Sequence, residues 1–428
     1  MKEDIIPIIF VNGEELRTFA IGDKMTVHGH SYEWEGERVI HLSTEPYLHN
    51  YGIHGNALFS KSKLNEVSDS ELNFISYFIY VKDSNLGIEA EVSEKCDGKW
   101  ISRPSNYIPA KQELYSRSKG ILEVNILESK RVMIIGLGSF GSQIAIELAK
   151  AGVGCFSLFD FDRVELHNLA RHTSTINDLG RLKTDVIYDA IKGKNPYAIV
   201  QKFPININDD LELLNKEIAK ADIVICATDN NKSRFHISEA LVNQRRIGIF
   251  GRAVTRAEGG DVFRYRPDGP CYCCLIGAGF YDTNIDEITN LESARSDGRI
   301  PAYASEEDAD AMVQVGLSSD IEPICNMMVK LSLMELSRGS ESGIKCLESE
   351  LTYDYYIWAN RRERRHATWA AFPNAANRPT IMRWYGAKIP KDESCPLCSK
   401  GNIILEDGHE FEDGLKNDLD GVDIDKLL

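Results

Sequence analysis

Two groups of residues in this sequence have types and spacing that could carry chemistry. The first is a glycine-rich turn containing Gly136, Gly138 and Gly141, which is followed about 20 residues later by Asp160 and Asp162. Glycines at these positions let the backbone turn tightly, approach a phosphate closely and pack the next helix on its strand. The two carboxylates suit a contact with a ribose. The set predicts a nucleotide site, and by itself it suits NAD, FAD and ATP equally.

The second group consists of two Cys-x-x-Cys spacings. Cys271 and Cys274 form one pair, and Cys395 and Cys398 form the other. Four thiolates make a closed tetrahedral site, which is typical of structural zinc. A redox-active dithiol at Cys395 and Cys398 is the competing interpretation, but it leaves the first pair unexplained. The spacing therefore predicts a Zn²⁺ ion that ties a late segment of the chain back to the core, with Cys273 as an additional thiol between two ligands.

The elements that position the glycine turn follow a regular alternation. Short apolar runs typical of buried parallel strands alternate with helical patterns. The strands and helices are predicted, in turn, at 131–135, 142–151, 156–160, 183–192, 199–203, 211–220 and 223–226. Such an alternation is typical of a doubly wound, Rossmann-like α/β sheet.

Length and composition limit the classes of protein. With 428 residues, the chain is long enough for two or three domains, at least one with a substantial core. The formal net charge of −16 opposes nucleic-acid binding, which needs a basic surface. No apolar run reaches the roughly 18 residues of a membrane helix, and the N-terminus lacks the pattern of a signal peptide. We therefore expect a soluble, cytoplasmic protein that binds neither nucleic acid nor membrane.

Three regions are expected along the chain. Residues 1–113 contain strand-like runs broken by Gly, Asn, Asp and Ser, which predict a small α+β accessory domain of unknown role. Residues 114–405 contain the glycine turn and both cysteine pairs and form the main domain. Residues 406–428 carry nine acids against two lysines, a composition typical of a flexible tail.

The residues that follow the second predicted strand separate the possible nucleotides. The segment Asp160-Phe161-Asp162-Arg163-Val164-Glu165-Leu166-His167-Asn168-Leu169-Ala170-Arg171 resembles the Asp-x-Asp-x-Val-x-x-x-Asn-Leu-x-Arg signature of the ThiF, MoeB and HesA family, relatives of the ubiquitin-activating enzymes. The likeness runs from about residue 114 to 279 and resumes near Val315 and Trp384. It implies an adenylation domain that uses ATP and Mg²⁺.

Five residues take functional roles through this resemblance. Arg117 matches an arginine that, in the family, reaches the ATP of the neighbouring protomer, so the resemblance implies a homodimer. Lys183 matches the lysine of a Gly-x-x-Lys turn at the phosphates, and Asp229 matches the aspartate that helps to bind Mg²⁺. Asn168 and Arg171 belong to the signature itself.

The chemistry of adenylation calls for such a set. A carboxylate attacks the α-phosphate of ATP, so two anions must meet, and the site must supply cations and fixed donors rather than a strong base. Arg117, Arg171, Lys183 and an Mg²⁺ ion held by Asp229 would supply the positive charge, and Asn168 would orient phosphate oxygens. Each residue alone could be an ordinary surface residue, with Asn168 capping a helix, but the five occur together in the family's order.

Conjugating members of the family carry a thioester-forming cysteine after the first zinc pair, and this sequence departs from that pattern. Residues 275–316 contain no cysteine, and this acidic stretch is expected to be a mobile crossover segment near the tail of the substrate. Cys325 follows Pro323 in a helix expected at 324–337 and is expected to be a core residue. Either activation stops at the acyl-adenylate, or an unusual cysteine such as Cys273 or Cys325 forms the thioester.

The favoured hypothesis is adenylation of the C-terminal carboxylate of a ubiquitin-like, β-grasp protein, for conjugation or for sulfur transfer. Conjugation implies a conjugating enzyme as a further partner. A second hypothesis gives the same chemistry to a ribosomally made peptide in natural-product biosynthesis, with residues 1–113 binding the peptide. A non-catalytic scaffold has no need for the charged set, and an NAD-dependent oxidoreductase leaves Arg171, Asp229 and both cysteine pairs unexplained.

Overall fold

The chain forms two compact units, Met1–Arg117 and Ser118–Leu428. The computed structural model describes residues 6–34, 38–44, 53–84, 87–108, 114–254, 257–279, 316–341, 343–361 and 381–399. The expected tail at 406–428 and most of the expected crossover segment lie outside the described residues. In the described part of the chain, no helix is both long and apolar enough to cross a membrane.

The first unit is a mixed β-sheet with an α-helix. Its elements are β1 (Ile8–Asn12), α1 (Gly13–Ile21), β2 (Thr26–Trp34), β3 (Val39–Ser43), β4 (Ile53–Ser60), β5 (Tyr77–Ser84), β6 (Gly87–Cys96), β7 (Lys99–Arg103) and β8 (Ser105–Ile108). The described strands follow the order β7-β6-β5-β4-β2-β3-β1-β8. Helix α1 buries Leu16 and Phe19 in a core that also contains Ile9 and Phe59 from the sheet.

The second unit alternates strands with helices along the chain. Its elements are α3 (Val124–Leu127), β9 (Arg131–Ile135), α4 (Ser139–Ala151), β10 (Cys155–Phe159), α5 (Lys183–Lys194), β11 (Ile199–Phe203), α6 (Leu211–Lys220), β12 (Ile223–Cys226), α7 (Asn231–Gln244), β13 (Ile247–Ala253), β14 (Gly259–Tyr265), α8 (Tyr272–Gly277), α11 (Ser318–Ser337), α12 (Lys345–Glu350), β15 (Tyr355–Ala359) and β16 (Arg383–Ala387). Short 3₁₀ turns occur at η2 (Leu166–Asn168), η3 (Ile176–Asp178) and η4 (Ile207–Asp209).

The strands of this unit share one sheet, in the order β11-β10-β9-β12-β13-β14-β15-β16. The neighbours from β11 to β13 pair in parallel, and those from β13 to β16 pair antiparallel. The register places Ile135, the last residue of β9, opposite Phe159 of β10 and Cys226 of β12. Because these strands end together, the residues that follow them meet at one edge of the sheet.

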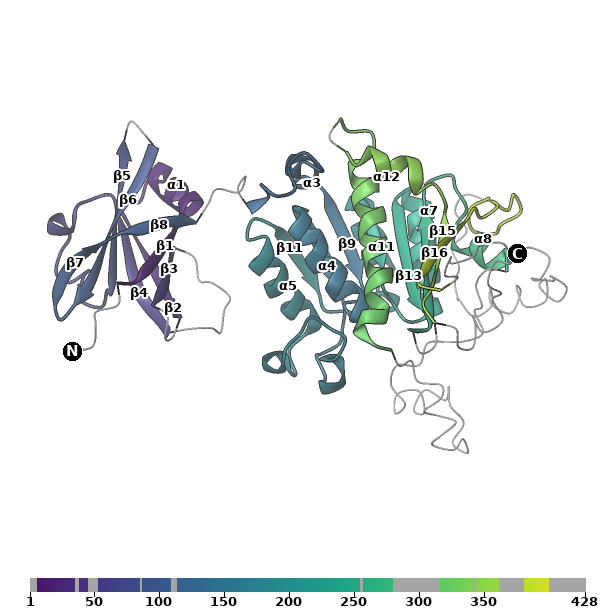
Figure 1. Ribbon diagram of the computed structural model, residues 1–428, viewed down its shortest axis with the longest axis horizontal. Helices are drawn as coiled ribbons and strands as arrows, with labels where there is room; N and C mark the ends of the chain where they lie inside the picture. The colour runs from purple at the N-terminus through teal and green to yellow at the C-terminus, as the bar shows by residue number, and fades with distance from the viewer. Residues whose placement is uncertain are drawn as a thin grey trace. The chain divides into compact units, whose positions relative to one another are not determined.

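Helices cover both faces of this sheet (Figure 1). Helices α4, α5 and α11 pack on one face through buried residues such as Ile144, Ile187 and Met328. Helices α6, α7 and α8 pack on the other through residues such as Ile218 and Phe235. Since both faces are covered, the central strands are apolar throughout, and all four residues of β12 are buried. The α/β fold with a parallel-rich sheet is confirmed.

Most predicted boundaries agree with the structure. Strands β11 and β12 and helix α6 have the predicted bounds. Helix α11 does not, because it begins at Ser318 rather than after Pro323, so that prediction was wrong. Proline removes one backbone donor but does not prevent a helix when other contacts support its first turn. Here Ile321 is buried, and Asp320 pairs with Arg361 at 2.5 Å.

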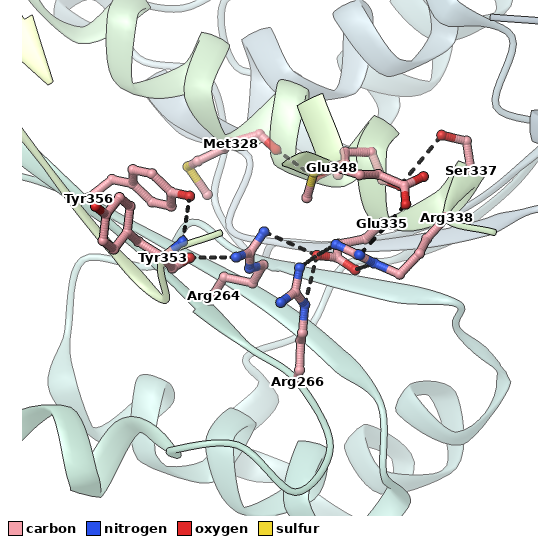
Figure 2. Close-up of polar contacts among 11 residues, drawn as sticks. Arg264, Arg266, Met328, Glu335, Ser337, Arg338, Glu348, Tyr353 and Tyr356 are labelled. Atoms are coloured by element: carbon pink, nitrogen blue, oxygen red, sulfur yellow. Dashed lines mark hydrogen bonds and ion pairs between the residues drawn. The ribbon is translucent and has the colours of Figure 1, made fainter. Parts of the chain in front are cut away.

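The C-terminal end of α11 is anchored to the sheet by a buried ion network (Figure 2). The carboxylate of Glu335 lies 3.1 Å from Arg264 of β14, 2.5 Å from Arg266 and 2.8 Å from Arg338. Burial alone would raise the pKa of Glu335, but hydrogen bonds from Arg338 and Arg266 lower it below its ordinary value. The network fixes α11, and Ile321 in the first turns of that helix lines the cavity described below.

Candidate functional site

A cavity of about 630 Å³ opens at the edge of the sheet where β9, β10 and β12 end. All its lining residues belong to the second unit. Eight of the residues singled out from the sequence line it: Gly136, Gly138, Asp160, Asp162, Asn168, Arg171, Lys183 and Asp229. A mostly parallel sheet predicts a ligand site at this position.

The glycine turn leaves no room for side chains at two of its three positions. Gly136 has φ +86°, and a Cβ there would lie 2.7 Å from the carbonyl oxygen of Ala227. A Cβ on Gly141 would lie 1.9 Å from the carbonyl oxygen of Gly136. Gly138 caps α4 without a side chain, so the first-turn N–H groups of the helix are available at the cavity. Such a helix start favours an anion.

Asp160 braces this turn. Its carboxylate accepts hydrogen bonds from the backbone N–H of Leu137 at 2.6 Å and of Asp162 at 2.8 Å. Burial raises the pKa of Asp160, although the charge of Lys183 and these hydrogen bonds oppose the rise. The two acids predicted to contact a ribose therefore differ: Asp160 is buried, whereas about half of the Asp162 side chain is exposed.

Lys183 is a charged group held in place by those acids. Its ammonium lies 2.8 Å from Oδ2 of Asp162, and its side chain is 11% exposed. Burial alone would lower the pKa of Lys183, but the carboxylates of Asp160, Asp162 and Asp229 raise it above its ordinary value. The cavity therefore contains a fixed positive charge near neutral pH.

Asn168 is the last residue of η2, and Arg171 follows three residues later. Oδ1 of Asn168 accepts the backbone N–H of Glu165 at 2.9 Å, so this side chain does cap a short helix, and its Nδ2 remains as a donor. Arg171 is half-buried, and burial lowers the pKa of its guanidinium, which stays charged. Asp229 is exposed in the short segment between β12 and α7, next to Asn230, which caps α7.

Some cavity residues have no counterpart among the sequence predictions. Arg252 of β13 is paired at 2.9 Å with Asp261, opposite it on β14, and both are buried. His172 follows Arg171 and also lines the cavity. The position of His172 directly after the signature was the one available signal. Arg117, in contrast, is an exposed turn residue that ends the first unit.

The four predicted zinc ligands come together in space. Their Sγ atoms all lie within 4.8 Å of one another. The separations are 3.8 Å from Cys271 to Cys274, 3.6 Å from Cys271 to Cys395, and 3.6 Å from Cys274 to Cys398. A tetrahedral zinc ion with Zn–S bonds of about 2.3 Å requires sulfur separations of about 3.8 Å. The donor set and its spacing therefore fit a closed zinc site.

Cys325 is buried in α11, as expected for a core residue. Its Sγ lies 4.0 Å from the backbone carbonyl oxygen of Phe140. Burial raises the pKa of this thiol well above its ordinary value. Because the thiolate is the nucleophile, Cys325 in this environment is poorly suited to form a thioester.

Comparison with known proteins gives a family match over residues 117–338, to the ThiF family. The molybdopterin-synthase adenylyltransferase of Escherichia coli is 37% identical over 152 residues, which cover 35% of this chain and 59% of that protein. The adenylyltransferase and sulfurtransferase UBA4 of Eremothecium gossypii is 28% identical over 204 residues, 46% of this chain and 44% of that protein. The chain thus spans less than two thirds of these relatives.

Among solved structures, that of Escherichia coli MccB with ATP is 18% identical to this chain. The likeness covers 64% of this chain and 68% of that one, with a TM-score of 0.45. At this level it carries no argument about function.

The glycine turn yields a prediction about stability. We expect Gly141→Ala to lower the free energy of unfolding by about 1–3 kcal/mol, because its methyl group would overlap the backbone of Gly136. Gly193→Ala is the matched control, since it is a helical glycine with nothing within 4 Å of the added Cβ, and it should gain up to about 1 kcal/mol. Equilibrium unfolding in urea measures both, and equal stabilities of the two variants would contradict the packing described.

Proposed function

The chain belongs to the ThiF family, and from that premise we propose that it is an adenylyltransferase that activates the C-terminal carboxylate of a ubiquitin-like protein. In this reaction a carboxylate oxygen attacks the α-phosphate of ATP, the bond to the β-phosphate breaks, and pyrophosphate leaves. The acyl-adenylate then serves conjugation or sulfur transfer. The ubiquitin-like substrate rests on the likeness of the signature between Asp160 and Arg171 to the enzymes that activate such proteins.

The observation that supports this proposal most is the gathering of the signature residues in one cavity. Lys183 and Arg171 provide positive charge, and the first-turn N–H groups of α4 provide donors. The attack brings two anions together, so these groups lower its barrier by offsetting the charge that accumulates at phosphorus. The nucleophile is already a carboxylate at neutral pH, so no general base is required.

Mg²⁺ fits the donor set of the cavity. This ion prefers oxygen ligands and is usually held by one or two carboxylates together with substrate phosphates. Asp229 is an exposed carboxylate at the cavity, and Asp229 also contributes to the positive shift in the pKa of Lys183. When bound, the ion would supply charge neutralisation for the phosphates, and Asp229 would hold it.

Arg117 is proposed to complete the site of a second copy. It is exposed at the end of the first unit, which leaves its guanidinium accessible to another protomer. Three large apolar side chains are more than half exposed: Phe161, which lines the cavity, and Leu166 and Ile176, which follow it in the chain; a second copy would cover them. The chain is therefore proposed to act as a homodimer in which each subunit lends one arginine to the other.

A zinc ion at the four cysteines is proposed to have a structural role. Cys271 caps the start of α8, while Cys395 and Cys398 lie in a turn near the end of the described chain. Cys271, Cys274 and Cys395 are buried and Cys398 is half-buried, and four thiolates would leave no open coordination position on a tetrahedral ion. The metal would cross-link these two segments through its bonds to sulfur.

The catalytic assignment predicts the effect of Asp229→Ala and Lys183→Ala on ATP–pyrophosphate exchange. With a purified ubiquitin-like protein that has a free C-terminus, each variant should lose about 10²–10³-fold in exchange rate, since each removes charge stabilisation of the transition state. Asp268→Asn is the control, because Asp268 is an exposed partner of Arg245 outside the cavity. Full exchange in both cavity variants would refute the catalytic assignment. Exchange that is driven by short peptides and not by the ubiquitin-like protein would show that the substrate is a peptide instead.

Mixing two inactive variants tests whether Arg117 acts in the site of the other subunit or in the site of its own subunit. Arg117→Ala and Asp229→Ala should each be inactive, yet a mixture should recover about a quarter of the wild-type rate. Half of randomly mixed dimers are heterodimers, and each of these has one intact site of two. No recovery after subunit exchange would contradict the shared site.

The cysteine cluster predicts about one zinc ion per chain by metal analysis. Changing Cys395 and Cys398 to serine should abolish metal binding and lower the unfolding midpoint, because the tie to α8 is lost. Cys346→Ser is the control, since this thiol is exposed and distant in sequence from both pairs. Folded protein that is isolated without any metal would count against the zinc site.

A further inference from the structure

One side chain at the glycine turn has no role in the proposed reaction. A Cβ on Gly138 would meet a single atom within 4 Å, Nε2 of His172 at 3.8 Å. The imidazole therefore lies over the part of the turn that is open to the cavity, at the start of α4. Phosphates bound by the N–H groups of that helix would lie beside this ring.

The ring of His172 does not serve the fold through hydrogen bonds. Among the residues that the structure describes, none forms a hydrogen bond with the imidazole, and the ring is half-buried. The segment is held instead through its backbone, since the N–H groups of Arg171 and His172 both donate to the carbonyl oxygen of Asn168 at 2.9 Å. The ring nitrogens are thus accessible to solvent or to a ligand in the cavity.

The surroundings of the ring are positively charged. Burial, together with the charges of Lys183 at the start of α5, Arg171 next to it and His167 on η2, lowers the pKa of His172 to about 3. Near neutral pH the ring is therefore neutral in the nucleotide-free chain, with one N–H donor and one acceptor. Phosphates in the cavity would oppose the effect of these positive charges and favour the protonated ring.

We infer that His172 contacts a phosphate of the bound nucleotide and takes up one proton from solvent when the nucleotide binds. The imidazole becomes an imidazolium with an N–H donor on each nitrogen, and no bond of the nucleotide changes. This inference rests on the nucleotide site of the proposed function. Protonation of His172 on binding would make nucleotide affinity depend on pH. When a group gains a proton on binding, the affinity rises as the pH falls.

The test is calorimetric titration of the full chain with Mg·ATP at pH 8 and pH 6, without any carboxylate substrate, in buffers of different ionisation enthalpy. His172→Gln is the informative variant, because glutamine keeps a donor of similar reach but cannot be protonated. His28→Gln, an exposed histidine of the first unit, is the matched control. All proteins receive the same ligand, so protonation of ATP itself cancels in the comparison.

We expect the Kd of the wild type to tighten between pH 8 and pH 6 by at least about threefold more than that of His172→Gln; full linkage would give about tenfold per pH unit. Proton uptake on binding should be greater in the wild type and in His28→Gln. Equal pH dependence and equal proton uptake in His172→Gln would overturn this inference and leave the proposed function in place. Absence of Mg·ATP binding by the wild type would overturn both.

Discussion

In the proposed reaction, electrostatic repulsion between two anions is the constraint that the second unit has to overcome. A site that brings a carboxylate to a phosphate must hold positive charge before either ligand arrives. The cavity does so with Lys183, whose charge is maintained by neighbouring carboxylates, and with the half-buried Arg171, which lines the same cavity. Asp160 holds the glycine turn through one carboxylate oxygen, which accepts the N–H of Leu137, and holds the segment after β10 through the other, which accepts the N–H of Asp162. The field inside the cavity is therefore a property of the fold itself.

That field depends on elements that lie away from the cavity. The common ends of β9, β10 and β12 place Gly136, Asp160 and the residues after Cys226 at one edge of the sheet. Helix α11 reaches the cavity at one end and is anchored through the buried Glu335 at the other. Burying an ion pair contributes little net stability, but removing one partner is costly, so such a network serves best to fix position. The four cysteines bring a later segment of the chain, around Cys395 and Cys398, close to Cys271 and Cys274 at the start of α8.

Much of this arrangement could be predicted from the sequence. Strands β9 and β12 were found because buried parallel strands are apolar runs, and the resemblance to the ThiF family is confirmed. The cysteine pairs were recognised by spacing, although 124 residues separate Cys271 from Cys395. The start of α11 was missed because burial of Ile321 outweighs the proline signal. Arg252 was missed because nothing in a local pattern shows which side chains a sheet edge brings together, whereas His172 was missed although it directly follows the signature.

The central claim is that the cavity binds the triphosphate of ATP between the glycine turn and its positive groups. The most direct measurement is a crystal structure of the chain with Mg²⁺ and an ATP analogue whose α and β phosphates are joined by a methylene group, which cannot be cleaved during adenylation. The phosphates are predicted to lie against the N–H groups at the start of α4, within hydrogen-bond reach of Lys183 and Arg171. A nucleotide bound outside the cavity, or one whose phosphates point away from both cations, would contradict the account.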